Sequence, residues 1–194
     1  MSRRAPAKVL EPEDLRRVLK HVKIQRHPIR NKTIILLSFK AGLRACEIAG
    51  LDWTMLLKSD YSLSDVMYVS KDIAKKGSFR HIPINAELKT VIKKLHKAVG
   101  QPRAGPVITS ERTGHMTAGS IVNYFGSLYQ ELELHGCSSH SGRRTFITNA
   151  AKALSQSGGS LRDIQELAGH KALTTTERYI QGDRDAQRKL ISMI

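Results

Sequence analysis

The sequence is poor in cysteine and lacks any long apolar stretch. Two cysteines, Cys46 and Cys137, occur in 194 residues; these are too few for a disulfide framework, and they lack metal-ligand spacing. They predict a reduced, cytoplasmic setting. No apolar run approaches the roughly 18 residues that cross a membrane. Arg3 and Arg4 are followed by Ala-Pro-Ala-Lys rather than by the apolar core of a signal peptide. We therefore expect no membrane partner.

Acidic side chains are also scarce. The chain has 17 Asp and Glu against 32 Lys and Arg, a formal charge of +15. Residues 1–32 hold ten basic and three acidic side chains, and residues 71–103 hold nine and two. Such clustering predicts surfaces that face phosphate, although a solvated basic face is the ordinary alternative. No clustered carboxylates are present to bind a metal ion, which argues against a metal-dependent nuclease.

The length suits one domain with a full core. Apolar residues at helical spacing predict helices over 12–26, 31–43, 44–51, 87–99, 118–132, 140–154 and 161–168. Runs rich in β-branched and aromatic residues predict strands over 55–58, 66–73 and 79–84, with Gly77-Ser78 closing a hairpin. Ser160 and Asp163 form a capping box, and Gly169 ends that helix. The expected fold is mainly α with a small antiparallel β-sheet (α+β).

Four residues in the last third of the chain have the chemistry to hold and attack a phosphate. They are His140 and Arg143 in HSGRRT, His170 in ELAGHK and Tyr179 in TTERYI. A tyrosine phenol has a pKa near 10, so as a nucleophile it needs a base and a cationic target. Arginine matches two phosphate oxygens with a planar, permanently charged fork, and histidine exchanges protons near neutral pH.

Two upstream motifs supply further groups of the same kind. GLRACEI places Arg44 and Glu47 three apart, on one face of a helix, and KKGSFRHIPI places Lys75 and Lys76 in a turn between strands. A second arginine would share the charge that develops on a five-coordinate phosphorus. A lysine could protonate the departing 5′-oxygen.

Each of these residues also has an ordinary structural explanation. Taken alone, His170 suits a surface histidine, Tyr179 a core residue, and His140 with Arg143 a charge pair at a helix start. Glu47 suits an exposed ion pair worth about 0.5 kcal/mol. Only the ordered set favours a common site.

That ordered set resembles the catalytic domain of the tyrosine recombinases, the phage integrase family. The resemblance covers roughly residues 10–180 and implies that the catalytic residues are Arg44, Lys75, His140, Arg143, His170 and Tyr179. Lys75 is preferred to Lys76 because the family's lysine usually lies eight residues before the proline of the second strand, here Pro83; Lys76 stays open. Glu47 would support the first arginine, and the expected DNA contacts are Lys76, Arg80, Arg144 and Lys171.

One position departs from the family pattern. The family often reads H-x-L-R-H, where this chain has Gly142 followed by Arg143 and Arg144. Because glycine costs about 0.5–1 kcal/mol inside a helix, we expect the helix to begin late, with its backbone free to approach DNA.

The resemblance implies site-specific DNA recombination through a 3′-phosphotyrosyl intermediate, with neither metal nor other cofactor. Two alternatives are a type IB topoisomerase-like enzyme and a DNA-binding regulator with an inactive relic site. The partner would be double-stranded DNA, in a cytoplasmic, nucleoid-associated setting in a bacterium, an archaeon or a phage-encoded system.

The expected organisation is a basic tail over 1–10, a catalytic domain over 11–182 and a helical tail over 183–194, without a separate core-binding domain. The chain is then either a minimal recombinase, similar in size to the short fimbrial phase-variation invertases, or a fragment. The helical tail would dock on a neighbouring subunit, giving a dimer to tetramer on DNA, or on its own core. DNA-bending accessory proteins are further candidate partners.

Overall fold

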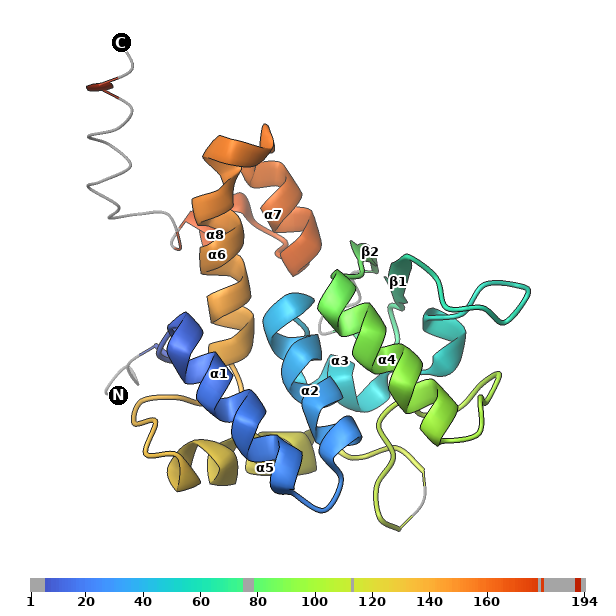
Figure 1. Cartoon of the computed structure of the whole chain (residues 1–194). Coiled ribbons are helices and arrows are strands. Elements are labelled where there is room, and N and C mark those ends of the chain that lie inside the picture. Colours follow the sequence, from blue (N-terminus) through green and yellow to red (C-terminus); the bar gives the residue numbers. More distant parts are fainter. Residues whose placement is uncertain (1–5, 75–78, 113, 178, 180–190, 193–194) are drawn as a thin grey trace.

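The computed structural model describes residues 6–74, 79–112, 114–177, 179 and 191–192. In the described part the elements follow in the order α1 (Pro12–His21), the 3₁₀ turn η1 (Val22–Ile24), α2 (Pro28–Lys40), α3 (Ala45–Gly50), η2 (Trp53–Met55), β1 (Val66–Val69), β2 (Arg80–Pro83), α4 (Ala86–Ala98), α5 (Ala118–Glu131), α6 (Ser141–Ser157), α7 (Leu161–Ala168) and α8 (Leu173–Glu177). Figure 1 shows a mainly helical molecule with the small sheet at one side. The expected fold class is confirmed.

Helix α2 forms the centre of the core. Every residue from Thr33 to Phe39 is buried, as expected for a helix that is surrounded by other elements on all sides. It packs against α4 and α6, while α3 packs against α5. Pro28 occupies the first turn of α2, where its missing N–H costs nothing, so this helix begins three residues before the expected start.

The sheet consists of β1 and β2, paired antiparallel with Val66 opposite Pro83 and Val69 opposite Arg80. Both strands are shorter than expected: residues 71–73, which follow β1, form turns, and β2 lacks the first and last residues of its expected range. The predicted Gly77-Ser78 turn lies outside the described residues. Strand β2 also contacts α7, which brings the sheet next to a helix far along the chain (Figure 1).

The predicted strand over 55–58 is wrong. Asp52 accepts hydrogen bonds from the backbone N and the hydroxyl of Thr54, at 2.9 and 2.8 Å, and these bonds start the 3₁₀ turn η2. An Asp side chain that bonds the backbone two residues on favours a turn over an extended strand. Only an isolated bridge between Leu57 and Leu63 remains of the strand.

The C-terminal part of the domain packs as a smaller unit. Ile147 of α6 and Ile164 and Ala168 of α7 form a second apolar cluster. The capping box of Ser160 and Asp163 begins α7, and Gly169 ends it in the left-handed conformation, as predicted. Helix α8 packs on α7.

Candidate active site

Arg44 is held in place by Glu47 at the start of α3. It is the N-cap residue of this helix. Glu47 accepts hydrogen bonds from the backbone N and the guanidinium of Arg44, both at 2.8 Å. The Glu47 side chain is fully buried, whereas 17% of the Arg44 side chain is exposed. The guanidinium of Arg44 is thus anchored on one side and open on the other.

Glu47 stays ionised in this buried position. Burial alone would raise its pKa, but the hydrogen bonds and charges of Arg80 and Arg44 hold the pKa below its usual value. The carboxylate therefore balances part of the positive charge around it. Arg44, Arg80 and Arg143 together carry three positive charges against the one negative charge of Glu47, so the cluster still attracts an anion.

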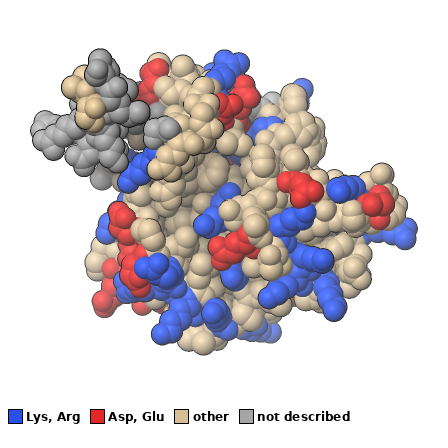
Figure 2. All heavy atoms as spheres, turned by 45° about the horizontal axis from the view of Figure 1, so that its top comes forward, with Lys and Arg blue, Asp and Glu red and all other residues tan. Residues whose placement is uncertain are grey.

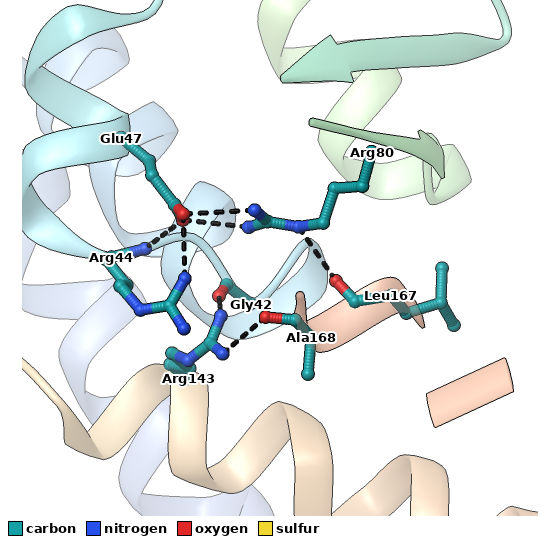
Figure 3. Close-up of polar contacts among 7 residues, drawn as sticks. All are labelled: Gly42, Arg44, Glu47, Arg80, Arg143, Leu167 and Ala168. Atoms are coloured by element: carbon teal, nitrogen blue, oxygen red, sulfur yellow. Dashed lines mark hydrogen bonds and ion pairs between the residues drawn. The ribbon is translucent and has the colours of Figure 1, made fainter. Parts of the chain in front are cut away.

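Arg143 lies in the first turn of α6 and joins three segments. Its guanidinium donates to the carbonyl of Gly42, at 2.7 Å, and to the carbonyl of Ala168. Burial, followed by repulsion from Arg44, lowers the pKa of Arg143 to about 9, so the side chain remains a cation at neutral pH. In Figure 3 its guanidinium lies beside that of Arg44, between α3 and the end of α7.

Arg80 completes this cluster from the sheet. Its two terminal nitrogens donate to the two oxygens of Glu47 at 3.0 and 2.8 Å, and its Nε donates to the carbonyl of Leu167 at 3.0 Å (Figure 3). The side chain is 4% exposed. This position differs from the surface DNA contact expected from the sequence.

His170 and Tyr179 lie together after α7. Their rings stack, with centroids 6.1 Å apart, and Nδ1 of His170 shares a hydrogen bond of 3.0 Å with the hydroxyl of Thr176 in α8. Burial, and then the charges of Arg143, Arg44 and Arg80, lower the pKa of His170 to about 4. His170 is therefore neutral at pH 7, and an anion bound nearby would offset the surrounding positive charge and favour its protonation.

Tyr179 packs against its own domain. It contacts the apolar cluster of α6 and α7, its backbone N donates to Thr176 at 3.0 Å, and the guanidinium of Arg144 lies 5.7 Å from its ring centroid. The nucleophile candidate thus reaches the site in cis.

One hollow of about 540 Å³ is shared by His140, Arg143 and Tyr179, three of the predicted catalytic residues. It is lined by Pro6, Ala7, Gly136, Ser138, His140, Arg143, Arg144 and Tyr179. Exposed His140 precedes α6, so its imidazole and the Arg143 guanidinium reach this space from one helix start. A second hollow, between β2 and α7, is lined in part by His170 and exposed Lys171. In the first hollow a phenol, an imidazole and guanidinium groups surround one space, and such a set can bind and attack a phosphate.

The predicted lysines Lys75 and Lys76 lie outside the described residues, so their assignment stays a prediction. Sequence reasoning missed the carbonyls of Gly42, Leu167 and Ala168, which orient the two inner arginines. No sequence signal marks a backbone carbonyl as an arginine acceptor, although Leu167 and Ala168 immediately precede a helix-ending glycine.

The expectation of a late start for α6 is wrong. The helix begins at Ser141. A Cβ on Gly142 would lie 2.3 Å from the hydroxyl of Ser38 and 2.7 Å from the ring of Phe39. Gly142 is therefore buried against α2 and allows the two helices to approach closely, which carries Arg143 down to Gly42.

Among the described residues, no group of three or more His, Cys, Asp or Glu side chains lies close enough together to hold a metal ion. None of the helices in this part of the chain has the length and apolar character that a membrane crossing requires. Figure 2 shows Lys and Arg over much of one face, most densely in its lower half, with fewer Asp and Glu among them.

Comparison with known sequences identifies relatives over most of the chain. The sequence model of the phage integrase family matches residues 8–185. Tyrosine recombinase XerC of Brucella suis is 32% identical over 160 residues, which are 77% of this chain and 45% of the relative. XerC of Bacillus pumilus is 30% identical over 169 residues, 82% of this chain and 52% of the relative. The chain thus spans about half the length of these curated relatives.

Solved structures with the same fold include the Tn1549 transposon integrase in complex with transposon right end DNA. The TM-score is 0.78 at 20% identity, covering 97% of this chain and 66% of that one. The XerA recombinase gives a TM-score of 0.71 at 18% identity, covering 97% and 65%. At this identity the likeness establishes the fold. With the sequence match over residues 8–185, it shows that the chain belongs to the phage integrase family.

Proposed function

We propose that the chain cleaves and rejoins DNA strands at specific sites through a 3′-phosphotyrosyl intermediate. The observation that carries this proposal is that segments far apart in the sequence place phosphate-binding and nucleophilic side chains next to one another. His140, Arg143 and Tyr179 line one hollow, Arg44 is the charged neighbour of Arg143, and His170 stacks on Tyr179. The family membership and the DNA complexes of structural relatives support the same conclusion.

In this mechanism Tyr179 attacks the scissile phosphate. A bond forms between the phenol oxygen and phosphorus, and the bond from phosphorus to the 5′-oxygen breaks. Lys75, or its neighbour Lys76, gives a proton to the departing 5′-oxygen. In the second step a 5′-hydroxyl attacks the phosphotyrosine and releases the phenol, so the energy of the phosphodiester is retained and no nucleotide cofactor is needed.

The arginines stabilise the charge of the transition state. Arg44 and Arg143 bind the non-bridging oxygens, and because Glu47, Gly42 and Ala168 already fix their guanidinium groups, little reorganisation is needed during the reaction. His140 and His170 hydrogen-bond the same phosphate. The phosphate also raises the pKa of His170 from its low value in the free protein, which enables this imidazole to assist proton transfer from the phenol.

The proposed catalytic domain spans residues 11–182, and its partner is double-stranded DNA. Arg144 and Lys171, which flank the two hollows, would contact the backbone near the scissile phosphate. We further propose self-assembly on DNA through residues 183–194. Of these, only Ile191 and Ser192 are described, and Ile191 is 70% exposed. DNA-bending proteins and a nucleoid location fit the same activity.

The test is covalent capture on DNA. The protein is incubated with nicked duplexes from candidate sites, so that the short 5′-hydroxyl strand diffuses away after cleavage and the adduct accumulates. We expect an SDS-stable adduct with the wild type and none with Tyr179→Phe, which leaves DNA binding intact. Binding without an adduct on any substrate would support a regulator with an inactive site; an adduct accompanied by supercoil relaxation but no strand exchange would support a topoisomerase-like enzyme.

A further inference from the structure

Arg80 is buried, yet every nitrogen of its guanidinium donates to an acceptor. Two bonds go to Glu47, which is 33 residues earlier in α3, and one goes to Leu167, which is 87 residues later in α7. An arginine fork can hold a carboxylate and a carbonyl in a fixed mutual geometry because its donors are coplanar. Arg80 thereby fixes the positions of three elements, β2, α3 and α7.

The bonds to Glu47 control the orientation of Arg44. Each oxygen of Glu47 accepts one bond from Arg80 and one from Arg44. Without Arg80, two of these four bonds are lost, and the buried carboxylate keeps the two bonds from Arg44. The carboxylate would then turn toward Arg44 and withdraw its guanidinium from the side that faces Arg143.

The bond to Leu167 acts on the other side of the site. The last carbonyls of a helix have no partner within the helix. In α7 the carbonyl of Leu167 accepts from Arg80 and that of Ala168 accepts from Arg143, so two arginines hold the turn that leads into His170. Gly169 lies directly on Arg80, since a Cβ there would be 3.1 Å from its Nη1.

We propose that Arg80 is a positioning residue, which ties strand β2 to Glu47 and to the last turn of α7, and so fixes Arg44 and His170 around the phosphate. The inference rests on the proposed function for its catalytic consequence, but its structural part can be measured without DNA. It differs from a DNA-contact role, because a side chain that is 4% exposed, with all three guanidinium nitrogens bonded within the protein, is too buried to contact a phosphate on the surface.

The experiment compares Arg80→Met, which fills the space without hydrogen bonds, and Arg80→Lys, which keeps the charge without the fork. The matched control is Arg162→Met, which removes an arginine that is 74% exposed on α7 and pairs with Glu166. Three quantities are measured for each protein: DNA affinity as a function of salt, the rate of adduct formation on nicked DNA, and hydrogen exchange at the amides of Gly169 and His170. These amides bond Glu166 and Gln165 at the end of α7.

We expect Arg80→Met and Arg80→Lys to keep the salt dependence of binding and to lose adduct rate by on the order of 10²-fold, as misplaced catalytic groups do. Exchange at Gly169 and His170 should be more than tenfold faster, and the exchange of α2 amides unchanged. Arg162→Met should leave exchange at Gly169 and His170 within about twofold of wild type, because its ion pair with Glu166 is exposed.

Two results would overturn the inference. One is an adduct rate in Arg80→Met close to wild type, with unchanged exchange. The other is a salt slope that falls by about 0.9, the signature of one lost phosphate contact, and accounts for the loss of rate. If the wild type forms no adduct, the proposed function fails while the exchange measurement still decides the role of Arg80. If Arg80→Met does not fold, Arg80→Lys, which keeps the positive charge beside Glu47, decides the question through the same three measurements.

Discussion

Gly142→Ala tests whether close packing of α6 on α2 sets the position of Arg143. The added methyl would lie 2.3 Å from the hydroxyl of Ser38 and 2.7 and 2.8 Å from two ring atoms of Phe39. Both neighbours are buried, so neither can move aside cheaply, and α6 must shift away from α2. We therefore expect the variant to weaken both the fold and the site.

The magnitude follows from two opposing effects. Overpacking a core typically costs about 1–3 kcal/mol, and replacing glycine by alanine in a helix gains at most about 1 kcal/mol. Packing should win, with a net loss of about 1–2 kcal/mol. In a domain of this size each kcal/mol lowers Tm by roughly 2–4 °C, so we expect a drop of about 2–8 °C by calorimetry, together with slower adduct formation.

Gly119→Ala is the matched control for this experiment. Gly119 is also the second residue of its helix, α5, but a Cβ there would meet only the Thr117 hydroxyl at an ordinary 3.8 Å. This variant should be as stable as wild type or slightly more stable. Adding Ser38→Ala to Gly142→Ala should restore part of the loss, because the Ser38 hydroxyl has no hydrogen-bond partner among the described residues. A Tm for Gly142→Ala equal to that of Gly119→Ala would refute the reasoning.

Two further predictions concern His170 and the C-terminal tail. Because the folded pKa of His170, about 4, lies below the ordinary value of about 6.5, protonation favours the unfolded chain, and stability should fall as pH drops from about 6.5 to 4. An NMR titration of the ring should find it neutral at pH 6, and His170→Gln should flatten the stability profile; a ring midpoint near 6.5 would contradict the structure. Truncation after Gly182 should abolish higher assembly on DNA in gel-shift and light-scattering experiments while leaving Tm unchanged, and unchanged assembly would remove the proposed role of residues 183–194.

Local signals made part of this structure predictable. Ser160, Asp163 and Gly169 specify the two ends of α7 through short-range hydrogen bonds and backbone conformation, and the sequence alone identified them. The antiparallel pairing of 66–69 with 80–83 follows equally from two β-rich runs close in the chain. These features depend on neighbours in sequence, so periodicity and capping rules apply to them.

Other features depend on tertiary contacts that the sequence does not mark. Arg80 looked like one more basic residue in a basic stretch, and only the approach of β2 to α3 and α7 shows it buried between Glu47 and Leu167. Gly142 looked like a weak helix start, whereas its lack of a side chain matters because Phe39 lies against it. In both cases the deciding partner lies more than 30 residues away.

The most direct test of the central claim is to locate the covalent bond. The adduct formed on nicked DNA is digested with nuclease and trypsin and analysed by mass spectrometry. Trypsin cleaves after Arg178 and Arg184, so the account predicts a nucleotide on the peptide of residues 179–184, attached to Tyr179 through a 3′-phosphate. A nucleotide on a peptide that contains another tyrosine, or attached through a 5′-phosphate, would contradict it.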